Sequence, residues 1–171
     1  MKINIVLFQP EIPQNTANIM RTCVGLNATL HLIKPYGFDL NLSERVFKRN
    51  ATNYVKEVEL IEYDSFDHFL EGKDQNNVFF LTRYGKKIYS DIALEEKSVV
   101  YYVFGRESSG IDKDILDKFE NQTFRIPMYN KMRSLNLANC VALVGYDGSR
   151  QMNFEGLENE EPHKINFWEK E

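Results

Sequence analysis

Three continuous apolar runs constrain the fold of this chain more than any other feature. They cover residues 3–8 (INIVLF), 77–82 (NVFFLT) and 98–104 (SVVYYVF). Apolar runs of this length, rich in β-branched and aromatic residues, are typical of strands buried on both faces of a parallel sheet. Stretches with helical patterns separate the runs, which indicates βαβ units. The sequence therefore predicts an α/β fold, a mostly parallel sheet flanked by helices.

Shorter segments complete the expected order of elements. A helix is expected over residues 15–25, where Ile19, Cys23 and Leu26 recur at helical spacing and predict a buried face. Asn15, Asn18 and Arg21 share another stripe of the same helix. Two interpretations fit this stripe, a solvated helix face or a polar site. Further strands are expected at residues 28–34, 58–61 and 123–126, and further helices at 43–48, 65–70 and 113–119.

Length and composition predict one domain with a sizeable core. The chain has 171 residues, of which 43% are hydrophobic. We expect a single domain over residues 1–151 and an acidic tail, partly disordered, over residues 152–171. The net charge of −4 argues against a protein that coats nucleic acid through bulk charge. A local basic patch would still suffice to bind RNA.

The cysteines and histidines predict neither a disulfide framework nor a metal site. Cys23 and Cys140 lack the spacing of either, and the three histidines lie far apart in the sequence. Free thiols in a reducing cytoplasm are expected. Residues 3–8 are too short for a signal peptide or a membrane span, so no membrane association is expected.

A glycine loop at residues 105–110 follows the third apolar run directly. Asp112 is expected to cap the helix that comes next. A strand, a glycine loop and a helix start in this order place a ligand at the carboxyl end of a parallel strand, although such a loop also serves as a simple tight turn. The loop matches neither GxGxxG nor the GK[ST] of a P-loop, which disfavours a nicotinamide-dependent enzyme or a nucleoside-triphosphate site.

A second candidate ligand site lies at residues 125–142 (RIPMYNKMRSLNLANCVA). Pro127 predicts a turn, and a polar, partly basic loop follows it. Ser134 is expected to be the N-cap of a helix, with Arg133 beside a positive helix terminus. The small and apolar residues of 135–146 predict either a core helix or a subunit interface.

Residues 14–21 (QNTANIMR), 104–111 (FGRESSGI) and 125–142 resemble, in this order and spacing, the three motifs of the SPOUT RNA methyltransferases. The resemblance is closest to the small single-domain members of the TrmL or YibK-like group, which methylate a ribose at the tRNA wobble position. It covers residues 2–151. Departures are Ala17 in place of a family glycine, an altered segment at 49–54, and Asp147 after the matching Tyr146.

The resemblance implies a C-terminal deep trefoil knot and a bound S-adenosylmethionine (the methyl donor). Carried over by position, the cofactor contacts fall on Leu81, Gly105, Ile126 and Ser134. The chemistry agrees, since adenine needs an apolar slot and a glycine allows close approach of the backbone. No metal is expected, because the methyl group already leaves from a sulfonium.

The same resemblance implies a catalytic Arg21 that orients the ribose 2′-OH or a neighbouring phosphate. It also implies a homodimer that binds the anticodon loop of tRNA at nucleotide 34, with the helix at 135–146 in its interface. Substrate contacts are expected from Asn15, Lys48, Arg49, Arg133 and Tyr146. Further RNA contacts are expected from Arg45, Lys86, Lys87 and Lys131.

Two alternatives stay open at this point. One is a SPOUT enzyme with another substrate, such as ribosomal RNA, or a base in place of a ribose. The other is a catalytically silent RNA-binding dimer that retains the fold, for which Ala17 and the altered segment at 49–54 leave room. The choice of tRNA isoacceptors, and of cytidine or modified uridine, also stays open.

Overall fold

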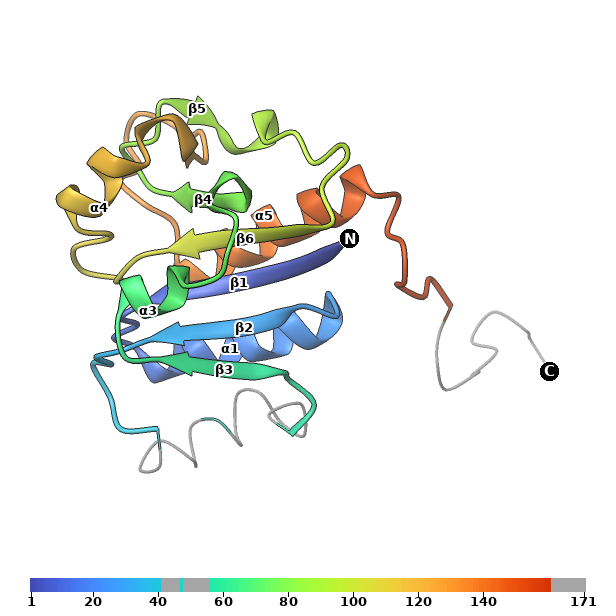
Figure 1. Cartoon of the computed structure of the whole chain (residues 1–171), viewed down its shortest axis with the longest axis horizontal. Coiled ribbons are helices and arrows are strands. Elements are labelled where there is room, and N and C mark those ends of the chain that lie inside the picture. The colour runs from blue at the N-terminus through green and yellow to red at the C-terminus, as the bar shows by residue number, and fades with distance from the viewer. Residues whose placement is uncertain (41–46, 48–55, 161–171) are drawn as a thin grey trace.

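The computed structural model describes residues 1–40, 47 and 56–160, and within them seven strands form one sheet in the order β3-β2-β1-β6-β4-β7-β5 (Figure 1). Every pairing between named strands is parallel, which confirms the predicted fold class. The strands are β1 (Lys2–Phe8), β2 (Thr29–Ile33), β3 (Leu60–Tyr63), β4 (Val78–Leu81), β5 (Lys87–Ile88), β6 (Val99–Phe104) and β7 (Thr123–Arg125). The helices are α1 (Pro13–Gly25), α3 (Phe66–Leu70), α4 (Lys113–Lys118) and α5 (Leu137–Gln151), with short 3₁₀ turns at η2 (Gln75–Asn77), η3 (Tyr89–Asp91) and η4 (Glu120–Gln122).

The central strands explain why the apolar runs do not alternate with polar residues. In β1, Ile5 and Leu7 point to the core that α1 and α5 cover, whereas Val6 and Phe8 point to the core of α3 and residues 111–119. Successive side chains of a strand face opposite sides, so a sheet with helices on both faces needs apolar residues at every position. All three predicted apolar strands are confirmed. The strand expected at 58–61 is shifted to Leu60–Tyr63, and the helix expected at 43–48 lies outside the described residues apart from Phe47.

The order of the strands brings three chain segments to one edge of the sheet. β7 pairs with β4 on one side and with β5 on the other, although β4 and β5 are neighbours in sequence. The turn between β4 and β5 packs closely against the backbone of β7. The Thr82 N–H donates to the Phe124 carbonyl at 2.9 Å, and a Cβ at Gly85 would lie 2.2 Å from the Phe124 carbonyl carbon. Only a glycine fits this approach, and it brings the ends of β4 and β7 together.

The predicted N-cap of the last helix is wrong. α5 begins at Leu137, and its N-cap is Asn136, whose side-chain oxygen accepts the Ala138 N–H at 2.9 Å. The amide of Asn136 also donates to Asn15 Oδ1 at 2.9 Å, a second bond that a serine hydroxyl at position 134 does not make. Ser134 lies exposed in the segment before the helix.

The cap of α4 also differs from the prediction. Asp112 stands at the N-cap position, but its carboxylate makes no bond to the helix and pairs with Arg106 instead. The helix expected at 65–70 is α3, and its N-cap is Ser65, which accepts the His68 N–H at 3.1 Å. None of the helices in the described part of the chain is long and apolar enough to span a membrane.

Candidate functional site

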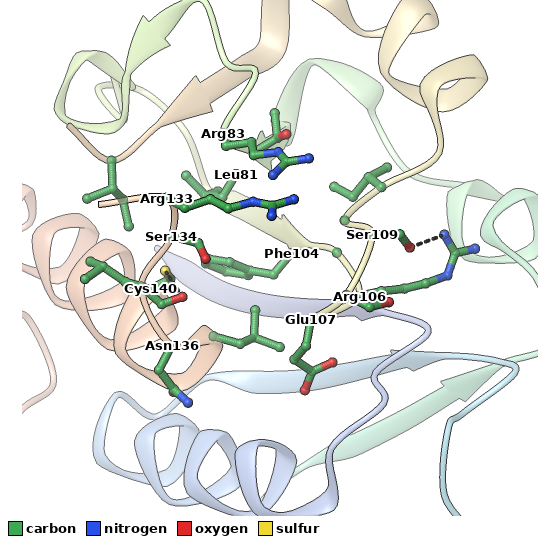
Figure 2. Close-up of a pocket in the computed structure, with 18 of the residues that line it drawn as sticks. Leu81, Arg83, Phe104, Arg106, Glu107, Ser109, Arg133, Ser134, Asn136 and Cys140 are labelled. Carbon is green, nitrogen blue, oxygen red and sulfur yellow. Dashed lines mark hydrogen bonds between the residues drawn. The ribbon is translucent and has the colours of Figure 1, made fainter. Parts of the chain in front are cut away.

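A cavity of about 560 Å³ opens where β4, β6 and β7 end (Figure 2). Its lining comes from residues 81–84, 104–111, 126, 128, 133–137 and 140, and from Ile12 and Asn15 at the start of α1. The four residues expected to hold the cofactor all lie on it, namely Leu81, Gly105, Ile126 and Ser134. They come from three segments that are separate in the chain, and the parallel sheet brings them together because the carboxyl ends of its strands share one edge. The other apolar lining residues are Ile12, Phe104, Ile111, Met128, Leu135 and Leu137.

Two glycines fix the shape of the loop after β6. The Arg106 N–H donates to the Gly110 carbonyl at 3.1 Å, and the Gly110 N–H donates to the Arg106 carbonyl at 3.0 Å. A Cβ at Gly105 would lie 2.4 Å from the carbonyl carbon of Gly110, which is closer than any side chain allows. Gly110 has a φ of +77°, in the left-handed region. The glycine loop predicted at residues 105–110 is therefore a turn closed by two backbone hydrogen bonds, and it lines the cavity.

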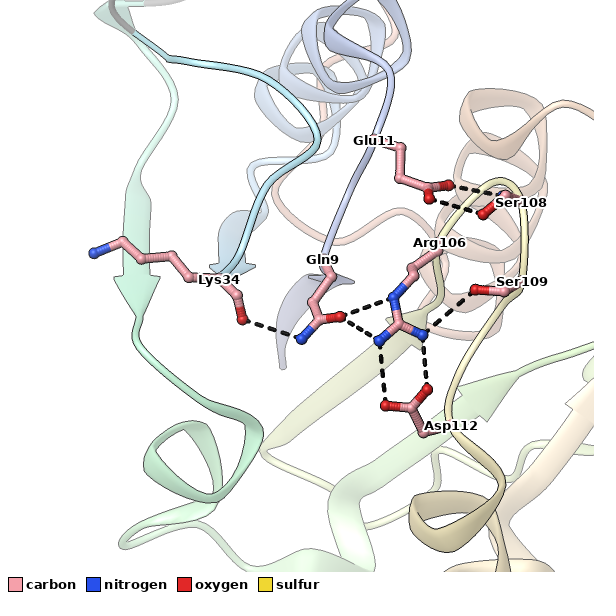
Figure 3. A network of polar contacts seen from close by, with 7 residues as sticks. All are labelled: Gln9, Glu11, Lys34, Arg106, Ser108, Ser109 and Asp112. Atoms are coloured by element: carbon pink, nitrogen blue, oxygen red, sulfur yellow. Dashed lines mark hydrogen bonds and ion pairs between the residues drawn. The ribbon is translucent and has the colours of Figure 1, made fainter.

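Arg106 holds this loop against the end of β1 (Figure 3). Its guanidinium donates to Gln9 Oε1 at 2.8 Å and to both oxygens of Asp112 at 2.7 and 3.2 Å. It also lies over the ring of Phe8, 4.8 Å from the centroid. The hydrogen bond from Arg106 holds the pKa of Asp112 below its usual value. Sequence reasoning did not single out Arg106, although it lies inside the recognised glycine-loop motif.

A second carboxylate binds the other side of the loop. Glu11 accepts hydrogen bonds from the Ser108 hydroxyl at 2.7 Å and from the Ser108 N–H at 2.8 Å (Figure 3). These two bonds lower the pKa of Glu11. We call residues 105–112, together with Gln9 and Glu11, the clamped wall of the cavity, since its polar groups are matched within the protein.

Glu107 connects the clamped wall to both long helices. Its carboxylate accepts the backbone N–H groups of Glu11 and Ile12 at 2.9 and 3.3 Å and the side-chain amide of Asn15 at 3.0 Å. Asn15 in turn accepts the amide of Asn136, which caps α5. This chain of hydrogen bonds ties together the three segments of the recognised motifs. The prediction named Asn15 but missed Glu107, because neither residue shows its partner in the sequence.

The opposite side of the cavity is built differently. Arg83 and Arg133 both line the cavity, and Figure 2 shows both side chains extending into it. No carboxylate of the described part of the chain forms an ion pair with either guanidinium. Arg83 lies over the ring of Tyr84, 4.7 Å from the centroid. We call Arg83, Tyr84 and Arg133 the open wall.

The remaining predicted site residues are spread over three places. Asn15 and Arg133 line the cavity, whereas Arg21 and Tyr146 do not. Arg21 is exposed on α1, and the Tyr146 hydroxyl of α5 lies 3.2 Å from where a Cβ of Gly25 would be. Lys48 and Arg49, like Arg45, lie outside the described residues. Of the other predicted RNA contacts, Lys86 pairs with Glu120, Lys87 donates to the Asn121 carbonyl, and Lys131 is exposed.

Within the described ranges, no group of three His, Cys, Asp or Glu side chains is placed to hold a metal ion. His31 is a core residue, 3.0 Å from both Asn4 Oδ1 and Tyr63 Oη. Burial lowers the pKa of His31 to about 4, with a contribution from Lys73. Cys23 and Cys140 are free thiols, and burial raises the pKa of Cys23 to about 12. Cys140 lines the cavity, partly buried.

A parallel sheet with a ligand-sized cavity at its carboxyl edge defines a class of cofactor- or substrate-binding α/β proteins. Comparison with known proteins gives the family. Residues 2–146 match the model of the SpoU rRNA Methylase family. The chain belongs to this family.

Individual relatives are similar over nearly the whole chain. A protein of Geobacillus stearothermophilus named "Putative tRNA (cytidine(34)-2'-O)-methyltransferase" is 39% identical over 92% of this chain and 99% of its own length. A solved structure described as "Structural insights into the 2-OH methylation of C/U34 on tRNA" is 38% identical, with a TM-score of 0.81 over 90% of this chain and 97% of that one.

A more distant structure shares the fold alone. The SpoU methyltransferase AviRb of Streptomyces viridochromogenes, in complex with its cofactor AdoMet, has a TM-score of 0.76 at 19% identity. The match covers 89% of this chain and 58% of AviRb. The α/β architecture is therefore retained even where most residues differ.

Proposed function

We propose that this chain is an S-adenosylmethionine-dependent methyltransferase that methylates the ribose 2′-OH of nucleotide 34, a cytidine or a modified uridine, in the anticodon loop of tRNA. The observation that carries the proposal is the single cavity that gathers Leu81, Gly105, Ile126 and Ser134. The substrate rests on relatives named for this reaction that are similar over nearly the whole chain. The cytoplasm is the proposed location, because tRNA is the proposed substrate.

The cavity fits S-adenosylmethionine in size and in chemistry. Its volume of about 560 Å³ suits one molecule of this size, since ligand pockets span roughly 300–1,000 Å³. We propose that Leu81 and Ile126 form the apolar slot for adenine, and that Gly105 and Ser134 supply close contacts through their backbone. When bound, the cofactor supplies a methyl group on a positively charged sulfur, which leaves without help from a metal ion.

The residues of this chain have to bring a weak nucleophile into line with that methyl group. Holding two reactants in near-attack geometry can supply ~7–11 kcal/mol in favourable cases. The proposed catalytic residue is Arg21. A guanidinium stays protonated and is a poor base, so its role is to orient the 2′-OH or a neighbouring phosphate. The Asn15 amide donates to Glu107 and accepts from Asn136, which favours a positioning role for it over direct substrate contact.

The position of Arg21 outside the cavity lining supports a homodimer as the active form. α1 and α5 pack together, and Arg21, Leu143 and Tyr146 are exposed on them. Exposed apolar side chains on paired helices are typical of a subunit interface. In the proposed dimer, this helix pair meets its copy, and Arg21 of one protomer acts on RNA held at its partner's cavity. Sedimentation should give the mass of two chains, and Leu143→Asp should yield monomers without transfer activity.

The trefoil knot implied by the family is also part of the proposal. Two features support it: β7 is inserted between β4 and β5, and α5 then returns to pack on β1 and β6. A chain that enters between two consecutive strands and leaves over another part of the sheet is placed to pass through their connecting loop. An experimental backbone trace that opens to a straight line when both ends are drawn apart would contradict the knot.

The decisive experiment locates the methyl group. Purified protein, S-adenosylmethionine and tRNA should yield a 2′-O-methyl group at nucleotide 34, mapped by nuclease digestion and mass spectrometry. The same modification should disappear from tRNA of cells that lack the gene. Methylation of ribosomal RNA alone would support the alternative substrate. Calorimetry that detects no binding of S-adenosylmethionine, with or without RNA, would support a silent RNA-binding dimer.

The role of Arg21 has its own test. Arg21→Ala should keep wild-type affinity for S-adenosylmethionine and lose methyl transfer by about two orders of magnitude or more. Lys118→Ala, which removes an exposed cation from α4, is the matched control and should transfer at the wild-type rate. Unchanged transfer by Arg21→Ala would refute its catalytic role without touching the cofactor site.

A further inference from the structure

The turn that follows β4 presents an aromatic ring at the cavity. Tyr84 is 65% exposed and lines the cavity together with Arg83. The Arg83 guanidinium lies 4.7 Å from the centre of the Tyr84 ring and donates a hydrogen bond to its hydroxyl. The two side chains thus form one surface of an aromatic ring and a planar cation. Neither the cofactor contacts nor the catalytic residue proposed above account for it.

The backbone under this surface is rigid. The Gly85 N–H donates to the Thr82 carbonyl at 3.1 Å, and the Tyr84 N–H donates to Thr82 Oγ1 at 3.3 Å. Thr82 is bonded to β7, and Gly85 is in tight contact with the backbone of Phe124. An exposed ring on a turn held from both sides is preorganised to bind a flat ligand, because little freedom is lost on binding.

We infer that Arg83 and Tyr84 form a stacking platform for the base of the nucleotide whose ribose is methylated. The inference deepens the proposed function and rests on it. Nucleobases stack on aromatic rings and on arginine planes. Arg133 lines the same cavity and pairs with no carboxylate of the described residues, so its guanidinium suits the phosphate of the same nucleotide. Leu81, a proposed cofactor contact, lies three residues before Tyr84 and lines the same cavity, so a base on the platform lies beside the proposed cofactor site.

Stacking also suits a site that has to accept either a cytidine or a modified uridine. It tolerates any base, since every base has a π-face, whereas hydrogen bonds to base edges discriminate between cytidine and uridine. A platform of this kind would hold a cytidine or a modified uridine in the same place. The identity of the tRNA would then be read elsewhere in the anticodon loop.

The test measures how variants of the full-length protein bind an RNA anticodon stem-loop. S-adenosylhomocysteine serves as the probe for the cofactor site. Tyr84→Ala should weaken binding of the stem-loop by between about fivefold and a hundredfold, as expected for the loss of one stacked base. Tyr84→Phe keeps the ring and should bind within about twofold of wild type. Tyr129→Ala is the matched control, because Tyr129 is 72% exposed and does not line the cavity.

A stem-loop that lacks the base of nucleotide 34 identifies what the ring contacts. If Tyr84 stacks on that base, Tyr84→Ala should have no further effect on binding of the abasic RNA, so the two changes are not additive. An equal loss on both RNAs would overturn the inference. Weaker binding of S-adenosylhomocysteine alone by Tyr84→Ala would also overturn it, since the ring would then belong to the cofactor site.

A parallel methylation assay separates the two proposals. If the wild-type protein leaves nucleotide 34 unmethylated, the proposed function fails, and this inference fails with it. If the wild type methylates nucleotide 34 and Tyr84→Ala binds and methylates RNA equally well, the inference alone is refuted. The melting temperature of each variant should stay close to that of the wild type, because the substituted side chains are exposed.

Discussion

Each wall of the cavity contains arginine, but the two walls differ in whether its charge is matched by a carboxylate of the described residues. On the clamped wall, Arg106 pairs with Asp112, and Glu11 binds Ser108. On the open wall, Arg83 and Arg133 extend into the cavity, and no carboxylate of the described residues pairs with them. A guanidinium that is matched within the protein shapes the backbone, whereas one without an anionic partner is available to an anionic ligand. The clamped wall is therefore expected to determine stability and cofactor affinity, and the open wall RNA affinity.

The largest expected effect comes from Gly105→Ala on the clamped wall. The new Cβ would lie 2.4 Å from Gly110 C and 2.6 Å from Ile111 N, so backbone must move. We expect a loss of about 1–3 kcal/mol of stability from overpacking, and cofactor affinity at least about tenfold weaker because the loop lines the cavity. Calorimetric titration with S-adenosylmethionine and urea unfolding measure the two effects.

Gly72→Ala is the control for this substitution. Gly72 has a φ of +70°, and a Cβ added there would have no neighbour within 4 Å, so only backbone strain is added. The Gly72→Ala protein should lose about 1 kcal/mol in the free energy of unfolding and keep wild-type affinity for S-adenosylmethionine. A Gly105→Ala protein with wild-type affinity would show that the clamped wall is not a rigid part of the cofactor site.

Removing the carboxylate of Glu107 should have the next largest effect. Glu107→Ala leaves two backbone N–H groups and the Asn15 amide without their acceptor. The expected cost is about 1–3 kcal/mol in the free energy of unfolding. Glu95→Ala removes an exposed glutamate and should change stability by less than about 0.5 kcal/mol. Equal urea midpoints for the two variants would mean that the Glu107 network does not hold the helices.

On the open wall, Arg133→Ala should leave the free energy of unfolding nearly unchanged and weaken RNA binding. The side chain is exposed, so the unfolding free energy should change by less than about 0.5 kcal/mol. If Arg133 binds a phosphate, the slope of log affinity against log salt concentration should fall by about 1. Filter binding of tRNA over a salt series measures the slope, with Lys118→Ala as the control. An unchanged slope would remove Arg133 from the RNA contacts.

The smallest effect is a pH dependence of the clamped wall. The pKa of Asp112 in the folded protein lies below its ordinary 3.8, since Arg106 stabilises the carboxylate. The pairing therefore contributes stability above that pH, and the contribution is lost as the pH falls through the lowered pKa. Wild type should exceed Arg106→Gln by about 1 kcal/mol or less near pH 7, as both side chains reach solvent.

Urea unfolding measured from pH 7 to pH 3 tests whether the stability from the Arg106–Asp112 pair decreases as the pH falls. The difference between wild type and Arg106→Gln should shrink as the pH falls below 3.8. A difference that stays constant over this range would assign the effect of Arg106 to its contacts with Phe8 and Gln9 instead of to its charge.

Much of the fold was predictable from local pattern. The apolar runs that became β1, β4 and β6 have no polar face, and only a sheet covered on both sides can bury such strands. The glycine loop was visible because tight turns need glycine at fixed places. Gly105 and Gly110 both prove to be required by the backbone.

The predictions that were wrong concern helix caps, where a polar side chain can bind either the helix N-terminus or another partner. Ser134 was the expected N-cap because serine is a good capping residue, yet Asn136 caps α5 and also binds Asn15, 121 residues earlier. Asp112 was the expected cap of α4, and Arg106 takes its carboxylate instead. A cap competes with every other partner within reach, and such partners are decided by tertiary contacts.

The sequence by itself determined the class of sheet, the places of its tight turns and, through motif resemblance, four residues that line one cavity. Only the tertiary structure decided which charged side chains are matched within the protein and which face the cavity. Arg106 and Arg133 look alike in the sequence. Arg106 meets Gln9 because β1 and β6 are neighbours in the sheet, and it meets Asp112 because the closed turn at Arg106 and Gly110 brings the two ends of the loop together. Arg133 forms no ion pair with a carboxylate of the described residues, because ion pairing depends on distance in space and not on residue type alone.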